Sequence, residues 1–147
     1  MTVSRKPLEE KPPSLGSLAR LPVFLALDGK RAVVAGGSAA AAWKAELLSA
    51  SGAQVDVYAA EPSDELLQVA ESPPRGAIAV NRRVWTADDL TGAAIAIGAF
   101  DDDEAAAKFA TAARARGVPV NVIDKPAFCD FAFGAIVNRS PLVIGIS

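Results

Sequence analysis

The stretch from Arg31 to Leu48, RAVVAGGSAAAAWKAELL, constrains the fold more than any other part of the chain. A short apolar run stops at Gly36-Gly37, and a segment with helical spacing, in which Ala41, Ala45 and Leu48 share one face, begins directly afterwards. A strand, a glycine turn and a helix can hold a pyrophosphate, because glycines let the backbone approach the ligand and the helix N-terminus offers unpaired N–H groups. The stretch therefore predicts a dinucleotide-binding turn. A tight strand-to-helix turn in any α/β domain is the alternative.

The glycine pattern departs at one position from the usual fingerprint, G-x-G-x-x-G/A. The loop reads GGSAAA from Gly36, so that Ser38 stands where the second glycine is expected. A serine hydroxyl can itself contact phosphate. We therefore predict that Gly36, Gly37 and Ser38 belong to a cofactor-binding loop.

Composition excludes several classes of protein. The chain of 147 residues is 51% hydrophobic and 22% charged, as expected for one globular domain. Fifteen basic and seventeen acidic residues leave a net charge of −2 without a basic block, which argues against a nucleic-acid partner. No apolar run approaches the roughly 20 residues that span a bilayer, so no membrane segment is predicted. The single cysteine, Cys129, excludes an internal disulfide and suits a reducing cytoplasm.

The chain contains no histidine. This absence excludes Ser-His-Asp and Cys-His catalysis and His-ligated zinc. Any proton transfer must therefore use carboxylates, lysine, tyrosine, the thiol or the substrate itself.

Strands and helices alternate along the rest of the chain. We predict further strands over 54–58, 77–80, 93–99 and 119–123, helices over 63–71 and 101–116, and one helical turn within 84–90. The acidic run 101–104 could bind a metal, but carboxylates at a helix start also suit the helix dipole, and we favour that interpretation. This order predicts an α/β fold, a Rossmann-like parallel sheet with right-handed crossovers and helices on both faces.

Ligands bind such sheets at the carboxyl ends of the strands. The residues at these ends are Gly36, Ala59 to Glu61, Phe100-Asp101 and Asp124, and we expect them to converge on one cleft. A carboxylate about 20 residues beyond the glycine loop is the usual ribose ligand. Glu61 fits this position, whereas its rival Asp56 lies in the middle of a strand.

The pattern changes after Asp124. Residues 128–137 and 142–146 predict two strands, and the residues between them, 138–141, form a good turn. No long helix separates these strands, so we expect an antiparallel hairpin. The last strand is barely finished at Ser147, from which we expect the chain to be one part of a longer protein.

Four segments in this order resemble the N-terminal region of siroheme synthase and the stand-alone precorrin-2 dehydrogenases. They are LPVFLAL at 21–27, GKRAVVAGGSAAAAWKAELL at 29–48, DDLTGAAIAIGAFDDDEAAAKFATAARARGVPVNVID at 88–124 and NRSPLVIGIS at 138–147. The resemblance implies NAD-dependent oxidation of precorrin-2 to sirohydrochlorin. It also implies ferrochelatase activity in the intact parent protein, with Fe²⁺ as substrate, and a homodimer whose hairpins exchange between subunits.

The resemblance also assigns site residues and domains. Ala39 and Ala40 fall where the glycine loop of the family meets NAD, Ala60 and Glu61 fall where the adenosine ribose is held, and Asp101 is a further cofactor-binding candidate. Asp124 matches the family aspartate of dehydrogenation and chelation, so it is the predicted catalytic residue and a transient Fe²⁺ ligand. We expect a flexible leader over 1–20, an NAD-binding domain over 21–125 and the start of a dimerisation and substrate region over 126–147.

The implied substrate is a tetrapyrrole with many carboxylates, so basic groups should line its pocket. We expect Lys125 and Arg139 to bind it, with Arg82 and Arg83 as further candidates. For each of these residues a solvated surface charge is the commoner role. Without the family resemblance, we would interpret Asp124 as a turn residue at the end of a strand.

Two other functions stay open. A non-enzymatic NAD(H)-binding regulatory module would use the same strand, loop and helix but would not need Asp124 or the Arg139 hairpin. A different small reductase would normally supply a tyrosine–lysine pair. Tyr58 is the only tyrosine, and no lysine follows four residues later, which argues against this second alternative.

Overall fold

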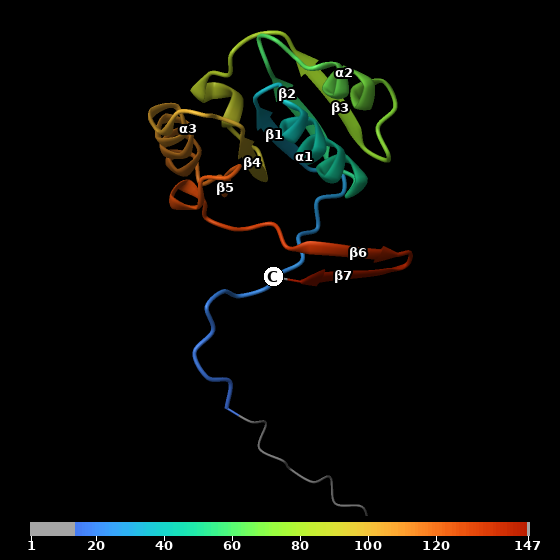
Figure 1. Ribbon diagram of the computed structural model, residues 1–147, viewed down its shortest axis with the longest axis vertical. Coiled ribbons are helices and arrows are strands. Elements are labelled where there is room, and N and C mark those ends of the chain that lie inside the picture. Colours follow the sequence, from blue (N-terminus) through green and yellow to red (C-terminus); the bar gives the residue numbers. More distant parts are fainter. Residues whose placement is uncertain (1–13, 147) are drawn as a thin grey trace, which may run out of the picture.

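A parallel five-stranded sheet forms the centre of the computed structural model, which describes residues 14–146 (Figure 1). The strand order is β3-β2-β1-β4-β5, so the order reverses between β1 and β4. The strands are β1 (Arg31–Ala35), β2 (Gln54–Tyr58), β3 (Ala77–Asn81), β4 (Ile95–Gly98) and β5 (Val120–Val122). The predicted α/β fold class is confirmed. Part of the predicted leader, residues 1–13, lies outside the described residues.

Each helix begins at a side chain that caps it. The helices α1 (Ala39–Ala50), α2 (Asp64–Glu71) and α3 (Asp103–Ala115) are capped by Ser38, Ser63 and Asp102, whose side-chain oxygens accept hydrogen bonds from backbone N–H groups of the first turn. Two short 3₁₀ helices, η1 (Ala87–Leu90) and η2 (Pro126–Phe128), complete the helical elements. The helices thus begin close to the residues that the sequence predicts.

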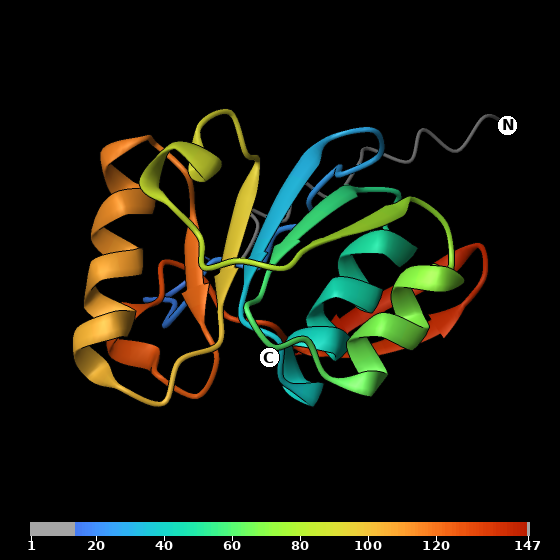
Figure 2. The same cartoon turned by 90° about the horizontal axis from the view of Figure 1, so that it is seen from above.

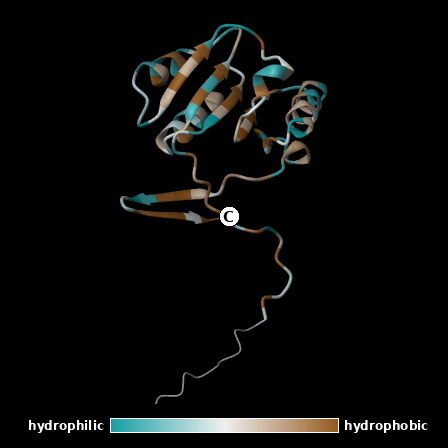
Figure 3. Ribbon diagram, turned by 180° about the vertical axis from the view of Figure 1, so that it is seen from behind, coloured by the Kyte–Doolittle hydropathy of each residue, from teal (hydrophilic) through white to brown (hydrophobic). Residues whose placement is uncertain are grey.

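Helices cover both faces of the sheet, with α1 and α2 on one side and α3 on the other (Figure 2), and the strands are largely coloured as hydrophobic (Figure 3). On one face, α1 and α2 pack against Val34, Val57 and Ile97, among others. On the other face, α3 and η1 pack against Val33 and Ala96. Alternate residues of one strand point to opposite faces, so the central strand β4, which is buried on both faces, is a continuous apolar run, whereas β2 alternates between apolar and polar residues.

The last two strands form a separate antiparallel hairpin of β6 (Ala135–Arg139) and β7 (Leu142–Ile146), which lies below the sheet in Figure 1. Every described residue of the two strands is exposed. The hairpin is confirmed, but its turn is shorter than predicted. Arg139 pairs with Leu142, so only residues 140 and 141 remain as the loop.

The prediction of a strand from Phe128 was wrong, because Phe128 ends η2 and residues 129–131 bind β5 instead. The Asp130 N–H donates to the Val120 carbonyl at 2.8 Å, and the Asp130 carboxylate accepts from the Val120 N–H at 3.1 Å. The Cys129 Sγ lies 3.2 Å from both the N and the O of Val122. These side chains close the edge.

Candidate functional site

The glycine loop packs so tightly against two neighbouring loops that its first two residues have no room for a side chain. A Cβ on Gly36 would lie 2.8 Å from the Ala99 Cβ, and one on Gly37 would lie 2.7 Å from the Glu61 carbonyl oxygen. Gly36 also has a φ of 126°, which favours glycine. The Gly37 carbonyl accepts a hydrogen bond from the Ser63 N–H at 2.8 Å. The ends of β1, β2 and β4 therefore meet, as the sequence predicts.

The N-terminus of α1 is suited to a diphosphate. Ala42 is the first residue whose N–H bonds within the helix, and the Ala41 N–H donates to the Ser38 Oγ at 3.2 Å. Within residues 14–146, the N–H groups of Ala39 and Ala40 have no hydrogen-bond acceptor. The first turn of α1 carries no acidic residue, in contrast to the first turns of α2 and α3. Helix dipole and free amides together fit the anionic part of a dinucleotide.

The loop after β2 carries the predicted ribose ligand. Ala60 and Glu61 are exposed, and Glu61 makes no ion pair with any described residue. Asp56, the rival carboxylate, instead accepts a hydrogen bond from the Arg31 Nε at 2.6 Å. This geometry leaves Glu61 as the carboxylate available at the end of β2.

The ends of β4 and β5 lie side by side, because the Ile123 N–H donates to the Gly98 carbonyl at 2.9 Å. Asp101 is exposed just before α3. Asp124 is exposed and has a φ of 60°, the one left-handed backbone among the described non-glycine residues. Aspartate tolerates this conformation better than most residues. The chain therefore changes direction at Asp124, directly after the end of β5, and leaves its side chain exposed.

A shallow hollow of about 260 Å³ lies beside Asp124. It is lined by residues of α1, of the β5 end and of the segment before the hairpin, and its charged residues are Arg20, Lys44, Asp124 and Lys125. The Lys125 Nζ lies 2.6 Å from an Asp103 carboxylate oxygen, so this ammonium already has an ion-pair partner.

Lys44 is the residue of this hollow that the sequence analysis missed. It is half-buried, and its Nζ lies 3.9 Å from the centre of the Phe133 ring. Burial lowers the pKa of the Lys44 ammonium, and the charge of Asp124 opposes this shift. No signal in the sequence separates Lys44 from an ordinary solvated lysine of an alanine-rich helix.

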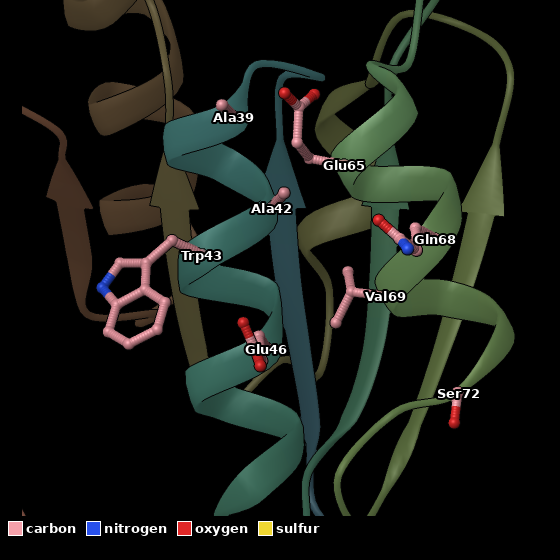
Figure 4. A pocket seen from close by; sticks show the side chains of 8 residues that line it. All are labelled: Ala39, Ala42, Trp43, Glu46, Glu65, Gln68, Val69 and Ser72. Carbon is pink, nitrogen blue, oxygen red and sulfur yellow. The ribbon is translucent and has the colours of Figure 1, made fainter.

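A second hollow, of about 460 Å³, lies between α1 and α2 (Figure 4). Glu46, Glu65 and Gln68 face this groove, whereas Trp43 points away from α2. Two carboxylates without a lining cation make the groove unsuitable for an anionic cofactor. The candidate site is therefore the edge formed by the strand ends.

Three of the predicted basic residues lie away from the hollow. Arg139 is the last residue of β6, at the tip of the hairpin (Figure 1), and does not line the hollow. Arg83 binds the Asp89 carboxylate through two nitrogens at 2.8 Å each, and its guanidinium lies over the Tyr58 ring. Arg82 is exposed after β3 and does not line the hollow.

Two absences hold for the described part of the chain. Among residues 14–146, no cluster of three or more His, Cys, Asp or Glu side chains is arranged for a metal ion. None of the helices in this range combines the length and hydropathy of a membrane-crossing segment.

Comparisons with known proteins agree with this geometry. Residues 23–135 match the family described as "Putative NAD(P)-binding". The chain is 42% identical over 127 residues to a siroheme synthase of Ectopseudomonas mendocina, which covers 86% of this chain and 26% of that protein. It is 41% identical over 127 residues to a siroheme synthase of Methylococcus capsulatus, with the same shares of 86% and 26%.

A solved structure, "SirC, precorrin-2 dehydrogenase", matches with a TM-score of 0.66 at 20% identity, over 87% of this chain and 61% of that chain. At this identity the match concerns the fold. The chain thus spans about a quarter of the siroheme synthases that it resembles, and the resemblance stated from the sequence is confirmed. Because the matched family covers most of the chain, the chain belongs to this NAD(P)-binding family.

Proposed function

We propose that the chain is the precorrin-2 dehydrogenase part of a siroheme-forming protein and oxidises precorrin-2 to sirohydrochlorin with NAD⁺. The observation that carries this proposal is Asp124. It is an exposed carboxylate on a left-handed turn at the strand-end edge, beside a hollow lined by cations. The similarity to siroheme synthases supports the substrate class.

The cofactor would be held by the glycine loop and the edge around it. The free N–H groups of Ala39 and Ala40 would bind the diphosphate, and Glu61 would accept hydrogen bonds from the adenosine ribose hydroxyls. Asp101 would line the same edge. Bound NAD⁺ supplies the acceptor for a hydride.

The reaction removes two electrons and two hydrogens from the substrate. A ring-bridging carbon would lose a hydride to the nicotinamide and the macrocycle would lose a proton, and the electron pair left by that proton would extend the conjugated double bonds. The chain has no histidine, and a carboxylate is one of the groups that could take the proton instead. Asp124 fits this role, because its carboxylate is exposed at the edge where the strands end. Apart from this proton transfer, the protein has to hold the reacting carbon of the substrate in position.

The same carboxylate could contact Fe²⁺ during insertion into sirohydrochlorin, since oxygen ligands suit a divalent metal. We propose this second activity for the intact parent protein only, with Fe²⁺ as substrate. A homodimer would supply Arg139 of one hairpin to the substrate surface of its partner. This arrangement would explain why Arg139 and Asp124 lie apart within one chain.

The change Asp124→Asn tests the assignment. Asparagine also tolerates a left-handed backbone, so we expect an unchanged melting temperature and unchanged NAD⁺ affinity. We expect NADH formation from precorrin-2 to fall by roughly two orders of magnitude or more, the usual scale for a general base. A matched control is Glu104→Gln, which removes an exposed carboxylate from the first turn of α3 and should leave the rate unchanged.

Two results would contradict the proposal in different ways. Near-normal NADH formation by Asp124→Asn would reduce Asp124 to a turn residue. Tight NAD(H) binding by the unmodified chain, without any NADH formation from precorrin-2, would favour the non-enzymatic NAD(H)-binding regulatory module.

A further inference from the structure

We propose that Lys44 binds a carboxylate of the substrate beside Asp124, an inference that rests on the proposed function. Helix α1 would then have two roles at one site. Its N-terminus faces the cofactor phosphates, and a side chain in its middle holds the substrate.

The position of Lys44 is fixed by the helix that carries it. Lys44 lies six residues after Ser38, which is about 9 Å along the helix axis. The neighbours Ala41, Ala42, Ala45 and Leu48 are buried against the sheet. A side chain on such an anchored helix is held more firmly than one on a loop.

The surroundings of the Lys44 ammonium favour an anionic ligand. No described residue forms an ion pair with Lys44, whereas the other lining lysine, Lys125, already binds Asp103. The Lys44 ammonium lies 3.9 Å above the Phe133 ring, where a cation–π contact fixes its direction but leaves its hydrogen-bond donors unsatisfied. A carboxylate in the hollow could accept from these donors.

The negative charge of the substrate also explains why the hollow beside Asp124 needs a cation that is free to bind it. Asp124 must approach a substrate that carries many carboxylates, and like charges repel. Arg20 lines the same hollow but is exposed. Lys44 is half-buried, so its charge is screened less by solvent. We therefore assign to Lys44, and not to Arg20, the larger share of substrate binding.

The experiment measures binding of uroporphyrin, a tetrapyrrole with eight carboxylates, by the quenching of its fluorescence. We expect Lys44→Met to weaken binding about tenfold or more, as for the loss of one charge-assisted hydrogen bond. Methionine keeps an apolar stem over Phe133, so the hollow should stay packed. Lys44→Arg keeps the charge and should bind within about threefold of the unmodified chain. NAD⁺ affinity should stay unchanged in both variants.

Lys108→Met is the matched control. Lys108 lies on α3 with its Nζ 6.0 Å from the centre of the Trp85 ring, on the other side of the sheet, and its loss should not change uroporphyrin binding. Coproporphyrin, with four carboxylates, should depend less on Lys44 than uroporphyrin does. If Lys44→Met does not fold, Lys44→Gln takes its place.

Three outcomes would overturn the inference. Equal uroporphyrin affinity in Lys44→Met and the unmodified chain would show that Lys44 does not bind the ligand. Equal losses in Lys44→Met and Lys44→Arg would indicate a packing role. Failure of the unmodified chain to bind uroporphyrin while it binds NAD⁺ would instead remove the tetrapyrrole substrate, and with it the proposed function.

Discussion

Ser38 illustrates how one residue can replace a glycine without strain. Its φ of −69° and ψ of 169° lie in the extended region, which any residue can adopt. Its hydroxyl oxygen accepts from the Ala41 N–H, and such a cap contributes about 1 kcal/mol to a helix. At Gly36 and Gly37, by contrast, an added Cβ would collide with Ala99 and Glu61. The loop thus keeps glycine only where the neighbouring backbone requires it.

Glu61 leads to a prediction about the choice of cofactor. We expect NAD⁺ to bind at least about tenfold more tightly than NADP⁺, because a carboxylate at the ribose would repel a 2′-phosphate. No Arg or Lys occurs between Gln54 and Leu67, and Arg83 after β3 already binds Asp89. Isothermal titration calorimetry with both nucleotides measures the ratio.

The change Glu61→Gln should narrow this ratio, whereas Glu65→Gln should leave it unchanged. Glu65 faces the groove between α1 and α2 (Figure 4), so Glu65→Gln is the control that removes a nearby carboxylate without touching the cofactor site. Tighter binding of NADP⁺ than of NAD⁺ by the unmodified chain would remove the role of Glu61.

At the scale of the elements, local signals were sufficient wherever the backbone bonds within its own element or to a regular neighbour. The alternation over 54–58 gave β2 with its observed bounds, and Ser63 caps α2 as expected. The apolar run 93–99 was correct in kind but two residues too long at its start, because β4 begins at Ile95. The ends of such runs are decided by pairing with neighbouring strands.

The sequence could not predict contacts between a side chain and parts of the chain that are far from it in the sequence. Phe131 and Phe133 have strand-like spacing, but they pack against the core while Asp130 and Cys129 bind β5. Lys44 was missed for a related reason. Its importance depends on Phe133 and Asp124, which lie about 80 to 90 positions further along the chain and reach it only in the folded state.

The turn that precedes η1 gives a prediction about acid stability. Arg83, with further hydrogen bonds from Thr86, holds the pKa of Asp89 well below its ordinary value of 3.8. This contribution is fully present above pH 3.8 and is lost as the pH falls towards the lowered pKa of the folded state. Asp89→Asn should therefore lower the melting temperature by a few degrees at pH 7.

Melting curves of the unmodified chain and Asp89→Asn between pH 8 and pH 3 measure this effect. We expect a constant difference down to about pH 5 and a narrowing below pH 3.8. The neighbour Asp88, whose side chain is 98% exposed, provides the control, since Asp88→Asn should change little. A difference that does not depend on pH would indicate a packing effect of the substitution.

At the scale of the whole molecule, the hairpin exposes apolar side chains that a second chain could cover. Ile136, Gly145 and Val143 share the face that lies towards Phe24, since a Cβ on Gly145 would lie 3.8 Å from that ring. The other face, which includes Ile144, is apolar and has no covering element among the described residues. A lone hairpin is marginally stable in water. We therefore propose that this face packs against a second copy of the chain.

Sedimentation equilibrium tests this proposal. We expect a dimer at micromolar concentration, and Ile144→Lys should shift it to monomer, because the change buries a charge in the interface. Val84→Lys is the control, as Val84 is 67% exposed and lies outside the hairpin. A monomeric unmodified chain at micromolar concentration would refute the proposed interface.

The closed edge of β5 has a consequence for how the chain can assemble. An uncovered edge strand is a template onto which another chain can add a strand, and this is a common start of aggregation. Here the outward N–H groups of Val120 and Val122 are bound by Asp130 and Cys129, so strand addition at β5 is blocked. Ordered growth of the sheet from that side would first require residues 129–131 to detach. The hairpin, and not the lateral edge of β5, is therefore the surface left for the proposed self-association.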